Sequence, residues 1–136
     1  MVEATDGTLI AQIRMEGQVN ENETLQTESA DGGKTWSVPH AISVWGLPSH
    51  LLRLADGRLL MSYGHRRMPF GNQARISTDH GGTWSEPISI STDGVRGDLG
   101  YPSTVQLGDG SLLTIWYEAM EKQTNAVLRQ TRWRIL

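Results

Sequence analysis

Only a few side chains in this sequence are suited to binding a charged ligand or to moving a proton. Arg14 is either a solvated arginine at a strand end or an anion-binding group, and the adjacent Arg66 and Arg67 are either cationic tips of a surface loop or a further place for an anion. Arginine suits this role because its planar guanidinium donates paired, charge-assisted hydrogen bonds to a carboxylate. Asp98, in the sequence Gly-Asp-Leu-Gly, is either a turn residue or a carboxylate able to act as acid or base.

The residue types that usually hold a metal or provide a thiol offer no pattern. The chain has no cysteine, so it contains no disulfide, no cysteine-ligated metal and no thiol nucleophile. His40, His65 and His80 show no metal-ligand spacing. We therefore expect neither a metal nor a cofactor.

The elements that must position these side chains are indicated by a repeated motif. The pattern S-x-D-x-G-x-T-W fills residues 29–36 and returns at residues 77–84. Self-similarity at a period of about 50 residues is typical of repeat architectures. The residue types suit a tight turn between two strands: the aspartate accepts backbone N–H groups, and Gly33 and Gly82 are expected to adopt positive φ. We expect the tryptophan of each motif to be structural and to cover the end of a sheet.

A second repeat supports the same period. Asp-Gly pairs stand at 6–7, 56–57 and 109–110, each between two apolar runs. Asp-Gly in this setting is a strong signal for a β-hairpin. We call the S-x-D-x-G-x-T-W motif at residues 29–36 and 77–84 an Asp box. The chain therefore holds about three copies of one unit. The unit is made of a strand, an Asp-Gly hairpin, a strand, a longer loop, a strand, an Asp-box turn and a last strand.

Composition excludes several classes of partner. At 136 residues with a net charge of −3, the chain lacks the basic patch that a nucleic-acid partner would require. No apolar run approaches the ~18–20 residues of a membrane span, and residues 1–20 lack the layout of a signal peptide. The chain has 15 glycines and five tryptophans, which suits many short strands joined by tight turns. The compartment stays open.

Four-stranded units of this length are the blades of a β-propeller. We expect an all-β fold, a single propeller arc over residues 1–136, with antiparallel blades at about 1–45, 46–92 and 93–136. The loop at 64–72 should carry the paired arginines, 15–22 and 91–100 should be loops, and His50 could point into the central pore or be an ordinary strand histidine. The first unit lacks most of its first strand, and the third has no Asp box and no obvious fourth strand.

Two or three blades form an arc and not a ring, and open sheet edges invite aggregation. Closure therefore requires a partner. Two copies could form a six-bladed ring as a homodimer, or the chain could be a fragment whose N-terminal half is missing. We favour the fragment, because the chain opens in the middle of a hairpin.

With both Asp boxes and all three hairpins, the chain resembles the C-terminal half of the six-bladed, sialidase-like propellers built from BNR repeats. The resemblance runs nearly end to end, although Asp boxes also occur in receptors and other non-enzymes. Residues 100–110 (GYPSTVQLGDG), followed by Trp-Tyr-Glu at 116–118, are similar to the sialidase segment that carries the nucleophilic tyrosine. The resemblance implies that Tyr101 is that nucleophile; the alternative is a buried tyrosine packed against the neighbouring blade.

The resemblance also assigns the arginines. Residues 6–14 are similar to the segment whose closing arginine binds the substrate carboxylate, which implies that role for Arg14. These enzymes keep another carboxylate-binding arginine ahead of the next Asp box. The resemblance implies this role for Arg66, with Arg67 as the second choice. A neutral tyrosine suits a substrate with a carboxylate on its anomeric carbon, which would repel a carboxylate nucleophile. A neighbouring glutamate must take the phenol proton.

The sequence departs from the family pattern in ways that bear on activity. Pro102 follows Tyr101 where a serine is expected. The partner glutamate is expected upstream of Met1, since Glu3 stands too close to the hairpin, and the first arginine and the acid aspartate belong to the N-terminal half. The resemblance implies a fragment of an exo-α-sialidase-like glycoside hydrolase, inactive alone, that binds a sialic-acid-like or other acidic glycan. The alternative is a non-catalytic propeller that binds a glycan or a protein.

Overall fold

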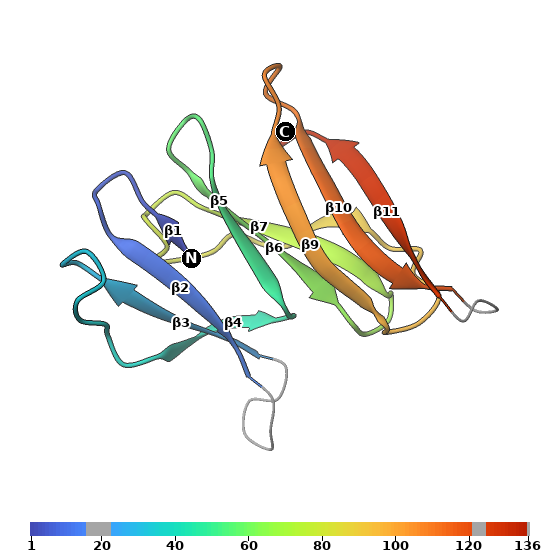
Figure 1. Ribbon diagram of the computed structural model, residues 1–136, viewed down its shortest axis with the longest axis horizontal. Coiled ribbons are helices and arrows are strands. Elements are labelled where there is room, and N and C mark those ends of the chain that lie inside the picture. The colour runs from blue at the N-terminus through green and yellow to red at the C-terminus, as the bar shows by residue number, and fades with distance from the viewer. Residues whose placement is uncertain (16–22, 121–124, 136) are drawn as a thin grey trace.

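The structure, a computed structural model, describes residues 1–15, 23–120 and 125–135. In these ranges the chain forms eleven β-strands and no helix (Figure 1). The strands are β1 (Val2–Glu3), β2 (Leu9–Arg14), β3 (Glu23–Ser29), β4 (His40–Trp45), β5 (Ser49–Arg53), β6 (Leu59–His65), β7 (Gly71–Ser77), β8 (Ile88–Ser91), β9 (Leu99–Gln106), β10 (Leu112–Ala119) and β11 (Ala126–Trp133). Within the described part of the chain, no helix is long and apolar enough to cross a membrane.

The strands form three antiparallel sheets that follow one another along the chain. Their orders are β1-β2-β3-β4, β5-β6-β7-β8 and β11-β10-β9. Figure 1 shows them side by side as an arc, from the blue first sheet to the red third one. The prediction of an all-β partial propeller is confirmed. The first strand of the first sheet has two residues, and the described residues of the third sheet supply three strands.

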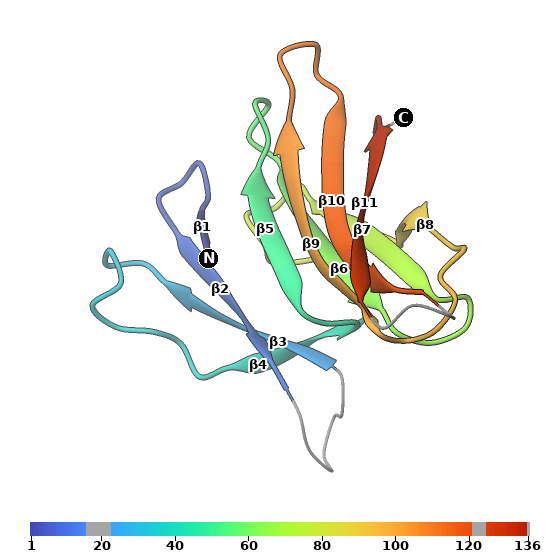
Figure 2. The same cartoon turned by 45° about the vertical axis from the view of Figure 1, so that its right-hand side comes forward.

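The three Asp-Gly hairpins lie on one rim of this arc (Figure 2). In each, the aspartate accepts the backbone N–H two residues on, at 3.0 Å for Asp6, 3.0 Å for Asp56 and 3.1 Å for Asp109. The glycines that follow have φ between 80° and 90°, a conformation that only glycine adopts at low cost. The other ends of β2, β6 and β9 therefore meet on the opposite rim.

Both Asp boxes form tight turns, between β3 and β4 and between β7 and β8. Asp79 accepts hydrogen bonds from the Thr83 backbone at 2.9 Å, the Thr83 hydroxyl at 2.6 Å and the Ser77 hydroxyl at 2.7 Å. These bonds lower the pKa of Asp79 to about 2. The expected positive φ is found at Gly33, but in the second turn it falls on His80 and Gly81 and not on Gly82. Gly81, and not Gly82, occupies the motif's glycine position.

Two apolar clusters hold neighbouring sheets together. The first lies between the first and second sheets and consists of Ala4, Ile10, Val44, Leu51, Leu59, Met61 and Tyr63. The second lies between the second and third sheets and consists of Leu54, Leu60, Ala74, Ile76, Ile90, Leu112 and Trp116. Each fully buried large apolar side chain contributes about 1.5–3 kcal/mol, so the sheets keep a fixed relative position.

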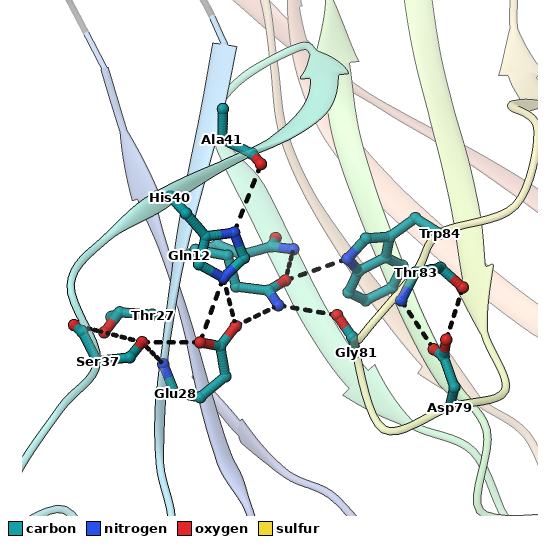
Figure 3. A network of polar contacts seen from close by, with 11 residues as sticks. Gln12, Thr27, Glu28, Ser37, His40, Ala41, Asp79, Gly81, Thr83 and Trp84 are labelled. Atoms are coloured by element: carbon teal, nitrogen blue, oxygen red, sulfur yellow. Dashed lines mark hydrogen bonds and ion pairs between the residues drawn. The ribbon is translucent and has the colours of Figure 1, made fainter.

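A polar network between the first sheet and the second Asp-box turn reinforces the first of these contacts (Figure 3). The Gln26 side-chain nitrogen donates to the Gly81 carbonyl at 2.9 Å and to the Glu28 carboxylate at 2.7 Å. The Gln26 side-chain oxygen accepts the Trp84 indole N–H at 3.1 Å. The second Asp-box tryptophan thus contacts the preceding sheet. In the first box, by contrast, the Trp36 indole donates to Gly33 of its own turn and is partly exposed.

The loops differ somewhat from expectation. The predicted loop at 64–72 is shorter, because β6 continues through His65 and β7 begins at Gly71, and β9 begins at Leu99, inside the loop expected at 91–100. Most of the loop expected at 15–22 lies outside the described residues. The outer faces of the arc leave apolar side chains exposed, namely Ile13 on the first sheet and Val105, Ile115 and Leu128 on the third. The identity of the closing partner, a second copy or further blades, stays a prediction.

Candidate functional site

Three of the sequence-predicted residues lie where the ends of three strands meet, on the rim opposite the Asp-Gly hairpins. Arg14 is the last residue of β2, Arg66 follows the last residue of β6, and Tyr101 is the third residue of β9. Each of the three sheets thus supplies one group. We refer to Arg14, Arg66 and Tyr101 together as the rim site.

The rim site is held together by direct contacts. The Arg14 Nη1 atom donates a hydrogen bond of 3.1 Å to the Tyr101 hydroxyl. The Arg66 guanidinium carbon lies 5.9 Å from the centre of the Tyr101 ring, and its Nε donates to the Leu99 carbonyl at 2.9 Å. Tyr101 is 57% exposed. Two cations thus flank a phenol that a ligand can reach, an arrangement suited to receiving an anionic group.

The backbone directs the Tyr101 side chain in an unusual way. Tyr101 has φ of 51°, and Gly100 before it has φ of 130°. A left-handed conformation is a genuine outlier for a bulky residue such as tyrosine. Gly100 faces Gly64 so closely that a Cβ on Gly64 would lie 3.2 Å from the Gly100 Cα. The close approach of β6 and β9 brings Arg66 to Tyr101.

Tyr117 is a member of this neighbourhood that sequence reasoning did not single out. Its ring lies 5.7 Å from the Tyr101 ring, its hydroxyl donates to Asp98 at 2.9 Å, and it accepts from Arg66 Nη2 at 3.4 Å. Burial, together with the hydrogen bond to Asp98, raises the pKa of Tyr117. The hairpin alone could not have placed it, because a register shift between Ile115 and Tyr117 sets the latter opposite Gly100.

Asp98, the candidate acid or base, contacts Tyr117 and Arg96. Its carboxylate accepts the Tyr117 hydroxyl and lies 3.8 Å from Arg96 Nη2. In the described part of the chain, no hydrogen bond joins Asp98 to Tyr101. Asp98 bears on the rim site through Tyr117, which also contacts Arg66.

The remaining candidates lie apart from Tyr101. Arg67 turns away from Arg66 and lies over the Trp45 ring, with its guanidinium carbon 4.3 Å from the ring centre. His50, on β5, accepts the Thr104 backbone N–H at 3.4 Å, and burial lowers its pKa. Among residues 1–15, 23–120 and 125–135, no group of three or more His, Asp or Glu side chains could hold a metal ion.

Comparison with known proteins assigns this chain to a family. The BNR repeat-like domain matches residues 1–114. The chain belongs to this family. A solved structure of a protein of unknown function from Dyadobacter fermentans DSM 18053 is 34% identical to this chain, with a TM-score of 0.86. The match covers 99% of this chain and 37% of the Dyadobacter chain. No curated protein matches the chain.

Two more distant solved structures are similar to this chain, and the first of them shares its fold. An ulvan lyase, described as a new polysaccharide lyase family, is 14% identical with a TM-score of 0.64, over 93% of this chain and 33% of its own. A Hadza microbial sialidase is 22% identical with a TM-score of 0.49, over 85% of this chain and 31% of its own. The BNR chain thus spans about a third of the length of these proteins.

Proposed function

We propose that this BNR chain carries the acidic-sugar site of a sialidase-like glycoside hydrolase. In this proposal, Arg14 and Arg66 bind the carboxylate of the sugar and Tyr101 is the nucleophile. The observation that carries it is the meeting of one group from each sheet, with Arg14 3.1 Å from the Tyr101 hydroxyl and Arg66 5.9 Å from its ring.

The charges at the site fit such a substrate. A sugar with a carboxylate at the reacting carbon would repel an aspartate or glutamate nucleophile, whereas a phenol is neutral until its proton is removed. The two guanidiniums can hold that carboxylate through charge-assisted hydrogen bonds. Arg66 is oriented by the Leu99 carbonyl and by the Tyr117 hydroxyl, so little side-chain entropy remains to be lost on binding.

A non-catalytic, glycan-binding propeller is the second candidate, and one observation favours it. In the described part of the chain, no carboxylate forms a hydrogen bond with the Tyr101 hydroxyl, since Asp98 contacts Tyr117 instead. A tyrosine nucleophile requires a base for its proton. The resemblance to sialidases implies a base and an acid in the N-terminal half of the ring.

Fluorogenic substrates distinguish the two candidates. The panel consists of 4-methylumbelliferyl glycosides of sialic acid, glucuronic acid and neutral galactose; glucuronate is included because an ulvan lyase structure holds a glucuronate–rhamnose 3-sulfate unit. In the complete propeller, which would include the proposed base and acid, we expect turnover of an acidic glycoside only, and Tyr101→Phe should abolish turnover and retain binding. Turnover by Tyr101→Phe at the wild-type rate would refute the nucleophile, and binding without turnover by the wild-type complete propeller would select the binding module.

The arginines are tested by affinity. Because a hydrogen bond to a charged group contributes about 1.5–3 kcal/mol, Arg14→Ala or Arg66→Ala should weaken binding of the acidic sugar roughly 10- to 100-fold. Arg58→Ala is the matched control, because Arg58 pairs with Asp56 at the hairpin rim, at the other end of β6. An equal loss in all three variants would contradict the assignment.

A further inference from the structure

Arg66 and Arg67 leave the end of β6 in different directions. Arg66 reaches the third sheet, where it contacts Leu99 and Tyr101. Arg67 reaches the first sheet, where its guanidinium carbon lies 4.3 Å from the centre of the Trp45 ring, at the end of β4. Their Cα atoms are only ~3.8 Å apart, but the Arg66 guanidinium contacts the third sheet and the Arg67 guanidinium contacts the first.

Arg67 is fixed in place without using its hydrogen bonds. Stacking on an indole occupies the face of a guanidinium and leaves the N–H groups at its edge. In the described part of the chain, no hydrogen bond or ion pair joins the Arg67 side chain to another residue, and the residue is exposed. An oriented guanidinium with open donors is what planar recognition of a carboxylate or sulfate requires.

A second observation lies beside the same tryptophan. The His65 ring is 5.9 Å from the Trp45 ring at an angle of 60°. His65 is 7% exposed, and its Nδ1 atom is buried without a hydrogen-bond partner among the described residues. Buried polar atoms are usually satisfied, so this orphaned nitrogen beside Trp45 points to a polar group that the described residues do not provide. Burial lowers the pKa of His65, which keeps the ring neutral and the local positive charge on Arg67.

We propose that Arg67, held on Trp45, is a second anion-binding subsite next to the rim site. The ligand is then a glycan with acidic groups, carboxylate or sulfate, on two adjoining sugars. Arg14 and Arg66 take one acidic group, and Arg67 takes the other. This inference rests on the proposed acidic-sugar site and specifies its ligand as an acidic oligosaccharide.

Disaccharides that differ in one acidic group test the proposal by calorimetry on the purified protein. Unsulfated chondroitin disaccharide has one acidic group, chondroitin 6-sulfate disaccharide adds a sulfate on the adjoining sugar, and digalacturonate has two adjoining carboxylates. We expect one or both doubly acidic ligands to bind the wild type about tenfold tighter than the singly acidic one. Arg67→Ala should remove this gain and leave the affinity for the singly acidic ligand unchanged. The arm that shows the gain identifies sulfate or carboxylate as the second group.

Two further variants keep the test specific. Arg67→Lys retains the charge but neither the planar fork nor the same stacking, so it should keep only part of the gain, and Arg58→Ala should keep all of it. A loss shared equally by singly and doubly acidic ligands in Arg67→Ala would assign Arg67 to the rim site and overturn the second subsite. If Arg67→Ala binds both kinds of ligand as tightly as the wild type, Arg67 only packs on Trp45 and the second subsite is refuted. Failure of the wild type to bind any of the three would overturn the acidic oligosaccharide as the ligand, whereas the rim site itself is tested separately by the fluorogenic sialic acid glycoside.

Discussion

The contact between the second Asp-box turn and the first sheet can be tested at a single glycine. Gly33 and Gly81 occupy the same position in the two boxes and have nearly the same backbone, with φ of 87° and 89°. Their surroundings differ. A Cβ on Gly33 would meet nothing closer than 3.5 Å, whereas a Cβ on Gly81 would lie 2.6 Å from the Cδ1 atom of Ile10.

The two alanine variants therefore separate backbone strain from steric overlap. A left-handed conformation costs an alanine roughly 1–2 kcal/mol, and Gly33→Ala should lose about that amount of unfolding free energy. Gly81→Ala should lose the same plus about 1–3 kcal/mol for overpacking. Ile10 is fully buried, so its methyl group cannot swing into solvent to relieve the overlap. The total for Gly81→Ala is about 2–5 kcal/mol.

Urea unfolding followed by tryptophan fluorescence measures both values. Gly108→Ala is the third variant, because Gly108 has no neighbour within 4 Å of the added Cβ and no positive φ; it should stay within about 0.5 kcal/mol of the wild type. If Gly81→Ala proves no more destabilising than Gly33→Ala, the tight packing of the second turn against the first sheet is wrong.

Two further predictions concern charge. The hydrogen bonds that lower the pKa of Asp79 to about 2 stabilise the fold above the unfolded pKa of ~3.9, and this contribution is lost as pH falls from about 4 to 2. In Asp79→Asn, the urea concentration at the unfolding midpoint should therefore change less between pH 4 and pH 2 than it does in the wild type. The same change in both proteins would contradict this prediction. The Glu118 side chain is 1% exposed and pairs with Arg129 at 2.9 Å. Arg129→Ala should cost about 3–5 kcal/mol, because it leaves a buried, uncompensated carboxylate; adding Glu118→Gln should restore much of this in thermal melts, and additive losses would refute the coupling.

Local signals were sufficient to predict the repeats. Each Asp-Gly pair and each Asp box specifies its own turn through hydrogen bonds to residues two to four positions away, so the turns could be read from short stretches. Arg14, Arg66 and Tyr101 lie close together because the ends of strands recur regularly around the arc. Their chemical roles stay predictions.

What the sequence could not supply depends on details between sheets. Tyr117 joins Asp98 and Arg66 only because a register shift precedes it on β10. The direction of the Arg67 side chain depends on where β4 ends, because its guanidinium leaves the second sheet to stack on Trp45 of the first. The glycine of the second box was assigned one position too far because two glycines follow one another there, and only the backbone angles distinguish them.

The left-handed backbone at Tyr101 has a consequence for how this position can change. Because the main chain sets the direction of the Cα–Cβ bond, another side chain placed here would leave in the same direction. Asparagine and glycine tolerate this conformation better than tyrosine does, so the backbone alone would favour either of them. The contacts of the ring with Arg14, Arg66 and Tyr117 therefore have to offset the backbone strain at Tyr101.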